Sequence, residues 1–261
     1  MNVPTYLLSG WQDIFRDQTL AQYQHLRGRG VPVELTVGPW SHFGLAEDWP
    51  LLVKESLSFL QRNLTQSDGV RKPALRVHVG GTNHWSGMES WPPDELNDEV
   101  YFLQPDAGLG TSRPVSTQPT CYRYDPMAPT PSVGGPTLAE DAGRRDNRGL
   151  ESREDVLTFT TTELQQPVAI AGSPRLELYF RSTARQTDFV ARICDVDPQG
   201  RSYNVTGPSK PLPFQRGNRC ENTFRRGTGE VDCTSWLPLF PLLAGACVEV
   251  DPSASGHSQA G

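Results

Sequence analysis

The sequence predicts an α+β fold, in which a βαβα unit is followed by a β-sandwich of the jelly-roll type. Residues 3–9 and 31–37 are short apolar runs typical of buried strands, and each is followed by a segment with helical spacing. From Pro73 onward, short β-type runs alternate with clusters of Gly, Pro, Asp and Asn. The 261 residues include 24 Gly and 23 Pro, which favours a loop-rich, mostly β chain.

The first predicted unit covers residues 1–70. A helix is expected in residues 13–28, where apolar side chains recur at helical spacing up to the glycines at 28 and 30. A second helix is expected in residues 50–64, which begin with a proline and carry leucines at 52, 57, 60 and 64 on or near one face. A strand–helix–strand–helix order predicts a parallel strand pair with a right-handed crossover.

The second predicted unit covers residues 71–261. Its strand candidates are LRVHVGG, EVYFLQ, VLTFTT, VAIAG, RLELYFRS and DFVARICDV. A long turn-rich excursion occupies residues 104–150, and residues 207–261 are Pro-rich and aperiodic. We interpret this last stretch as a divergent or damaged tail that reflects a frameshift, a pseudogene or a sequencing error. A DNA sequence that reads cleanly through the region in this frame would refute that hypothesis.

Composition excludes several classes of function. A formal net charge of -6 argues against a nucleic-acid partner. The longest apolar stretch, residues 236–250, is interrupted by two prolines and is too short to cross a membrane. The first residues lack the basic start of a signal peptide, so a cytoplasmic location is expected unless a signal precedes them. Five dispersed cysteines without a CxxC pair predict free thiols, and neither a cofactor nor a metal is expected.

Two titratable side chains follow the two predicted parallel strands. Asp13 comes after the first strand and His42 after the second, and functional groups collect outside the carboxyl ends of such strands. An Asp beside a His fixes the imidazole tautomer and stabilises the imidazolium, which is the arrangement found in Ser-His-Asp triads. The alternative is that Asp13 caps the following helix and His42 is a loop residue.

Longer motifs around these residues resemble a known family. The segments are GWQDIF, VGPWSH, PALRVHVGGTNHWSGMESWPP, YRYDPMAPTPSVGG, DVLTFTT and GSPRLELYFRS. Together they resemble the cocaine-esterase and X-Pro dipeptidyl-peptidase family of α/β hydrolases over residues 3–206. The resemblance implies that Asp13 is the triad acid and His42 the general base, with Gln12 in place of the family's Tyr. It also implies hydrolysis of a small-molecule ester or an X-Pro peptide through an acyl-enzyme.

No convincing nucleophile is present in this chain. The resemblance places the family's serine well upstream of the acid, at a strand-to-helix elbow. Ser9 lies inside a predicted strand, and Ser258 in GHSQAG has the wrong chain order and no helix after it. The chain is therefore expected to be a C-terminal portion of a hydrolase, a βαβα remnant plus a jelly roll, that is inactive alone.

Two partners are consistent with this expectation: another copy of the chain, or a complementary N-terminal fragment that covers the unpaired sheet edge. A different class of function stays open as well, a non-catalytic β-sandwich binding module with a vestigial α/β stub. An enzyme requires a nucleophile-bearing segment from elsewhere, whereas a binding module requires none.

Overall fold

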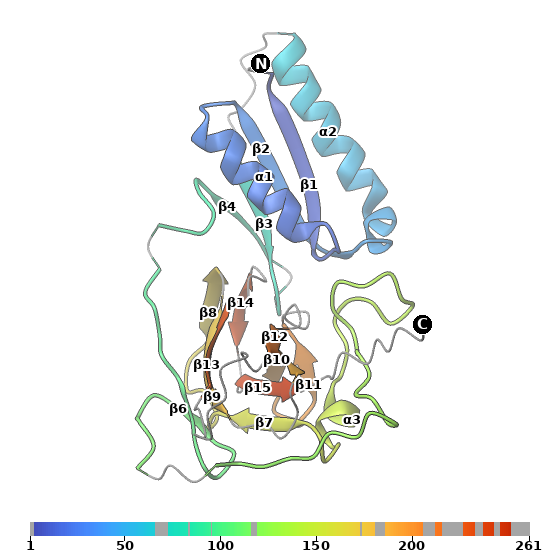
Figure 1. Ribbon diagram of the computed structural model, residues 1–261. Coiled ribbons are helices and arrows are strands. Elements are labelled where there is room, and N and C mark those ends of the chain that lie inside the picture. Colours follow the sequence, from blue (N-terminus) through green and yellow to red (C-terminus); the bar gives the residue numbers. More distant parts are fainter. Residues whose placement is uncertain are drawn as a thin grey trace.

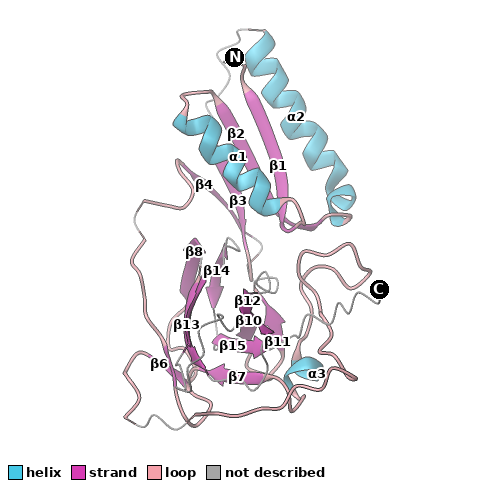
Figure 2. Ribbon diagram, viewed as in Figure 1, coloured by secondary structure: helices cyan, strands magenta, loops and turns pink. Residues whose placement is uncertain are grey.

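The computed structural model describes residues 3–65, 73–82, 84–94, 96–115, 119–172, 174–180 and 186–205, together with four strands between residues 212 and 251. A sheet with a helix on each face forms the first part of the molecule, and a mainly β part follows it (Figure 1). Apart from one short helix, all helices of the described residues lie in the first part (Figure 2).

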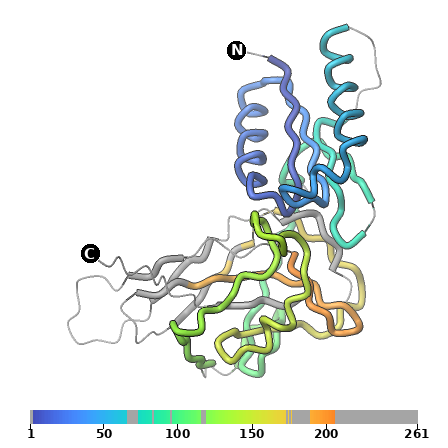
Figure 3. Tube along the Cα trace, turned by 90° about the vertical axis from the view of Figure 1, so that its right-hand side faces the viewer, coloured from blue at the N-terminus to red at the C-terminus, as the bar shows by residue number. Residues whose placement is uncertain are grey.

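The first sheet contains four strands in spatial order β1-β2-β3-β4. Their bounds are β1 (Thr5–Gln12), β2 (Val33–Ser41), β3 (Leu75–Val79) and β4 (His84–Met88). β1 and β2 pair in parallel, as predicted, and helices α1 (Arg16–Gly28) and α2 (Trp49–Leu64) cover opposite faces of the sheet (Figures 1 and 3). A 3₁₀ turn, η1 (Gly44–Asp48), joins β2 to α2.

Strand β3 lies in a different sheet from the one expected. The sequence analysis assigned the run at Leu75 to the sandwich, but β3 pairs in parallel with β2 and antiparallel with β4. Its alternating apolar side chains match the apolar face of β2, with Leu75 opposite Leu35 and Val77 opposite Val37. The first sheet therefore contains strands from both sides of residue 70. The domain boundary predicted near that residue stays a prediction.

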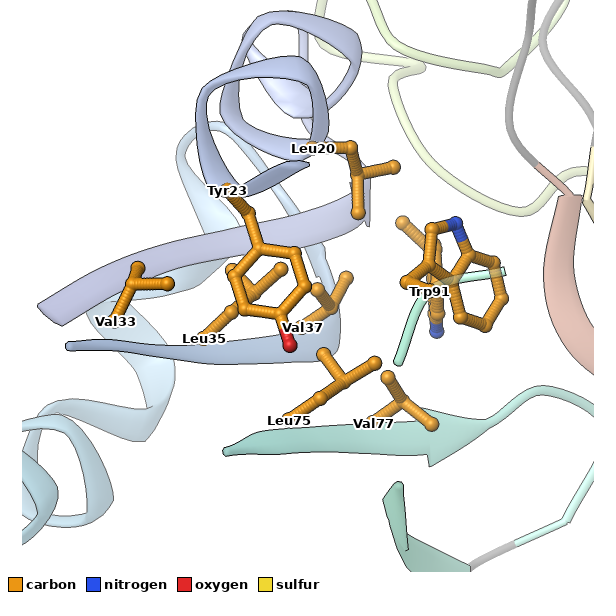
Figure 4. Packing of buried hydrophobic residues seen from close by; sticks show 9 residues of the cluster. Leu20, Tyr23, Val33, Leu35, Val37, Leu75, Val77 and Trp91 are labelled. Carbon is orange, nitrogen blue, oxygen red and sulfur yellow. The ribbon is translucent and has the colours of Figure 1, made fainter. Parts of the chain in front are cut away.

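The face of the sheet under α1 is apolar. Successive side chains on a strand point to opposite faces, so the odd-numbered positions of β1, β2 and β3 share this side. Leu20 and Tyr23 of α1 are fully buried against Leu35, Val37 and their neighbours. Figure 4 shows this cluster, which also includes Trp91 from the segment after β4. This packing fixes the ends of β1 and β2.

The opposite face, under α2, is polar and ion-paired. Arg62 of α2 binds Glu34 of β2 at 2.6 Å, and Glu55 of α2 binds Arg76 of β3 at 2.7 Å. The ring of Phe59 stacks on that of Tyr6, with 5.6 Å between centroids.

The leucines predicted for α2 do not share one face. Leu52 is buried on the sheet side, whereas Leu57, Leu60 and Leu64 are exposed. At 100° per residue, positions 57, 60 and 64 form a stripe that also passes through Trp49 and points away from the sheet. Trp49 is exposed as well.

Two glycines, one on β1 and one on β2, leave room for the ring and the backbone of Trp40 near the end of β2. Gly10 and Gly38 are opposite each other in register. A Cβ on Gly38 would lie 2.2 Å from a ring carbon of Trp40, and one on Gly10 would lie 2.0 Å from the Trp40 carbonyl oxygen. Only glycine fits at either position, because real Cβ contacts do not come this close.

We therefore expect Gly38→Ala to lower the free energy of unfolding by about 1–3 kcal/mol through overpacking. Gly28→Ala is the matched control. A Cβ on Gly28 would meet no other atom within 4 Å, and alanine has a higher helix propensity than glycine. Urea denaturation of the two variants measures the difference. Equal stabilities would contradict the packing described for Trp40.

The second part is built from antiparallel pairs, as predicted. Its elements are β5 (Phe102–Leu103), β6 (Leu109–Gly110), α3 (Arg148–Glu151), β7 (Leu157–Thr160), β8 (Val168–Gly172), β9 (Arg175–Phe180), β10 (Gln186–Val196), β11 (Ser202–Asn204), β12 (Leu212–Gln215), β13 (Gly227–Asp232), β14 (Leu237–Leu242) and β15 (Ala246–Asp251). A five-stranded sheet has the order β11-β10-β15-β7, and β12 also pairs with β10. Three further two-stranded sheets are formed by β13 with β9, by β14 with β8 and by β5 with β6. Strands β12 to β15 lie in residues 207–261, the stretch interpreted from the sequence as a divergent or damaged tail. That interpretation stays a prediction.

A buried polar network anchors the long segment between β6 and β7. Arg192 of β10 donates to the carbonyl of Val133 at 2.7 Å and to the side chain of Asn147. Asn204 of β11 accepts a 2.7 Å hydrogen bond from the backbone N–H of Arg145. Since buried polar groups are stable only when they are hydrogen-bonded, these contacts hold the segment against the sheet although it contains little regular structure.

Cys121 is an exposed free thiol, as predicted, and Cys194 is buried. The side chains of Cys220, Cys233 and Cys247 lie outside the described residues. None of the helices in the described ranges combines the length and the hydropathy that a membrane crossing requires.

Candidate active site

Asp13 occupies the turn between β1 and α1. The β1–β2 register shifts between Gly10 and Gln12, and the backbone N–H of Asp13 then donates to the carbonyl of Gly10 at 3.0 Å. The turn continues into α1, because the N–H of Arg16 donates to the carbonyl of Asp13 at 3.1 Å. It leaves Asp13 only 4% exposed, with its carboxylate directed into the protein.

His42 directly follows β2, and the structure brings it to Asp13. Nδ1 of His42 lies 3.1 Å from Oδ1 of Asp13. Because an ionised carboxylate only accepts hydrogen bonds, Nδ1 is the donor. The His42 side chain is 32% exposed, and Nε2 has no hydrogen-bond partner within the described part of the chain. The pair therefore presents an imidazole nitrogen of fixed orientation to solvent.

Two further donors satisfy the Asp13 carboxylate. The backbone N–H of Phe15 donates to Oδ1 at 3.1 Å, and the hydroxyl of Ser9 donates to Oδ2 at 3.3 Å. The structure therefore pairs Asp13 with His42 without making Asp13 the cap of α1, because the N-cap is Phe15 and has no side-chain cap hydrogen bond. The sequence analysis considered Ser9 only as a nucleophile. Ser9 lies on β1 and Asp13 in the turn that follows it, so their contact depends on that turn.

Aromatic rings flank the imidazole on two sides. The ring centroid of Phe15 is 5.2 Å from that of His42, and that of Phe43 is 5.4 Å away, both in edge-on geometry. The two phenyl rings are themselves exposed. They restrict rotation of the imidazole and leave Nδ1 facing the carboxylate. The sequence analysis did not single out either ring.

A cavity of about 380 Å³ adjoins the end of β2. Its lining residues are Pro39, Trp40, Ser41, Gly44, Glu47, Asp48, Ala142, Gly143, Arg144 and Arg145. One wall is formed by the end of β2 and η1, and the other by the anchored segment of the second part. The indole N–H of Trp40 donates to Asp48 at 2.8 Å, which fixes the first wall. The second part therefore contributes surface close to His42.

Other sequence candidates fall elsewhere. Trp91 packs on Trp11 of β1, with 5.2 Å between ring centroids, so it belongs to the first core. His78 of β3 is buried, with its ring edge-on against that of Trp85. Ser258 lies outside the described residues. Within the described ranges, no group of three or more His, Cys, Asp or Glu side chains is placed to hold a metal ion.

Two family models match the chain. The X-Pro dipeptidyl-peptidase (S15 family) model matches residues 1–44, which include both Asp13 and His42. The model of the X-Pro dipeptidyl-peptidase C-terminal non-catalytic domain matches residues 68–213, more than half of the chain. The chain belongs to the cocaine-esterase and X-Pro dipeptidyl-peptidase family. This membership confirms the resemblance drawn from the sequence motifs.

Cocaine esterase from Rhodococcus sp. (strain MB1 Bresler) is a family relative that is 30% identical in an alignment of 225 residues, and the alignment covers 76% of this chain and 39% of that protein. The crystal structure of an aminopeptidase from the marine sediment archaeon Thaumarchaeota archaeon matches with a TM-score of 0.74 and 21% identity, over 98% of this chain and 48% of its own. An α-amino acid ester hydrolase matches with a TM-score of 0.72 and 23% identity, over 97% of this chain and 48% of its own.

These structural matches support an α+β fold with a mixed sheet and few helices. The chain spans about two fifths of the length of cocaine esterase and about half the length of the two solved structures.

Proposed function

We propose that this chain supplies the acid, Asp13, and the general base, His42, of a serine hydrolase whose nucleophile lies on a segment outside the chain. One observation carries the proposal: His42 Nδ1 is 3.1 Å from Asp13 Oδ1 at the ends of two parallel strands, in a member of a hydrolase family. The uncommitted Nε2 then faces the position that a serine hydroxyl must occupy.

The chemistry follows from this geometry. His42 Nε2 takes the serine proton while the serine oxygen attacks the carbonyl carbon of the substrate. Asp13 holds the imidazole tautomer and stabilises the imidazolium. The proton then moves to the leaving oxygen or nitrogen as the acyl-enzyme forms, and His42 activates a water molecule to release the acid. A small-molecule ester or an X-Pro peptide is the proposed substrate class.

The second part is proposed to be a jelly-roll β-sandwich that does not take part in the chemistry. Its matching family model is described as non-catalytic. Residues 142–145 form one wall of the cavity beside β2, and Ser41, the residue before His42, lies on the other wall.

An exposed surface on the first part supports a separate nucleophile-bearing segment. In the described residues β1 forms an edge of the four-stranded sheet, so its outer backbone groups are open to another strand. The apolar stripe of α2 (Trp49, Leu57, Leu60 and Leu64) is exposed on the same part. Since cocaine esterase extends well beyond the matched region, we assign this surface to the hydrolase segment that carries the serine.

Hydrolysis assays test the proposal. The chain is expressed alone and together with a nucleophile-bearing segment encoded in the same genome, and p-nitrophenyl acetate and an Ala-Pro p-nitroanilide serve as substrates. The chain alone should hydrolyse neither, and the complex should hydrolyse at least one. A stable complex without activity, or activity that survives His42→Ala, would contradict the proposal.

A binding module is the second candidate, favoured by the non-catalytic description of the matching domain model. Under this alternative the chain has no requirement for a serine-bearing segment. Failure of that segment to bind the chain in the same experiment would make the binding function the leading one.

A further inference from the structure

One hydrogen bond joins the residue before Asp13 to the core of the second part. Nε2 of Gln12 donates to the backbone carbonyl of Val205 at 3.3 Å, across 193 positions of sequence. Gln12 is only 7% exposed, and Val205 is buried. The contact therefore lies inside the junction between the two parts.

The carbonyl that Gln12 binds is held firmly. The N–H of Val205 donates to the carbonyl of Ile193 on β10 at 2.9 Å. The side chain of Val205 packs in a cluster of the second part with Leu164, Val168, Ile170 and Ile193. The position of the Val205 carbonyl is therefore fixed by the packing of this cluster.

Gln12 is also placed to affect both members of the Asp13–His42 pair. It precedes Asp13 directly, and in the sheet register it is opposite Ser41, which precedes His42. A restraint on Gln12 consequently acts on the end of β1 and on the adjoining end of β2. Only the donor half of its amide is used within the described residues, because Oε1 has no hydrogen-bond partner there.

A buried amide is a costly way to fill space, since an apolar side chain of similar length avoids the desolvation of the unused oxygen. The hydrogen bond to Val205 is the contact that an apolar residue would lose. We infer that Gln12 is a positioning residue through which the second part fixes the geometry of the Asp13–His42 pair. The catalytic meaning of this inference rests on the proposed function.

The test is a proton NMR measurement on the intact chain, and it needs no activity. The Nδ1–H resonance of His42 is identified by its loss in His42→Ala and by its change in Asp13→Ala. In Gln12→Met it should shift upfield and exchange with water about two- to tenfold faster, the factor expected for the loss of one hydrogen bond. Gln12→Leu, a second apolar replacement that removes the donor without adding a charge, should behave in the same way even where Gln12→Met fails to fold.

Gln24→Met is the matched control. Nε2 of Gln24, on α1, also donates to a backbone carbonyl, that of Trp91 at 3.1 Å. This variant loses a comparable bond and should leave the His42 resonance unchanged. A resonance insensitive to both Gln12 variants would overturn the inference. The absence of any Asp13-dependent His42 resonance in the unmodified chain would instead count against the proposed function.

Discussion

Replacing His42 with alanine should lower kcat about 10⁶-fold in a complex that contains the nucleophile-bearing segment, as removal of the triad histidine does in subtilisin. Without Nε2, no group accepts the proton of the attacking serine. Asp13→Asn should lower kcat about 10⁴-fold, because an amide that donates to Nδ1 holds the wrong imidazole tautomer. The Asp13–His42 contact at 3.1 Å is the structural basis of both expectations.

His25→Ala is the matched control for the first of these variants. His25 lies near the end of α1 and is exposed to solvent, far along the chain from the turn at Asp13. Steady-state kinetics on an ester substrate should show an unchanged kcat for this variant. A His42→Ala complex that retains a tenth of the unmodified kcat would contradict the role assigned to His42.

Replacing Leu35 with alanine should lower the free energy of unfolding by about 2–5 kcal/mol. Leu35 is 1% exposed at the centre of β2, opposite Leu7 on one neighbouring strand and Leu75 on the other. Its removal leaves a cavity in the cluster that holds α1 on the sheet. Since His42 directly follows β2, the same variant should weaken the Asp13–His42 contact.

Leu57→Ala provides the comparison, because Leu57 is 59% exposed on α2. This variant should change the free energy of unfolding by less than about 0.5 kcal/mol. It should nevertheless weaken association with the nucleophile-bearing segment, which distinguishes a docking residue from a core residue. Urea unfolding followed by tryptophan fluorescence measures the first effect, and co-purification measures the second. Equal losses of stability in the two variants would contradict the burial described for β2.

The elements of the first part could largely be predicted, because local periodicity encodes them. The runs that became β1 and β2 and the spacing of α1 and α2 were visible in the sequence, and the parallel-strand rule brought Asp13 to His42. Pairing across distance was less visible. The run at Leu75 has the two-residue alternation of a strand, but this alternation does not indicate which strand it pairs with. In the structure it pairs with β2.

Contacts that depend on the meeting of distant segments were not predicted. The hydrogen bond from Gln12 to Val205 spans 193 positions, and no local pattern encodes it. The burial of His78 has a more local origin, because His78 is opposite Trp85 in the β3–β4 pair. Ser9 was visible as a residue but was considered for the wrong role, since its distance from Asp13 depends on the turn that follows β1.

Covalent labelling with a fluorophosphonate probe tests the central claim most directly. The complex of this chain with the nucleophile-bearing segment is treated with the probe, and mass spectrometry of the peptides locates the label. We expect the label on one serine of the partner segment, none on this chain, and no labelling when His42 is replaced by alanine. A label on a serine of this chain, such as Ser9 or Ser258, or labelling that does not depend on His42, would contradict the claim that this chain contributes the acid and base to a serine supplied from outside it.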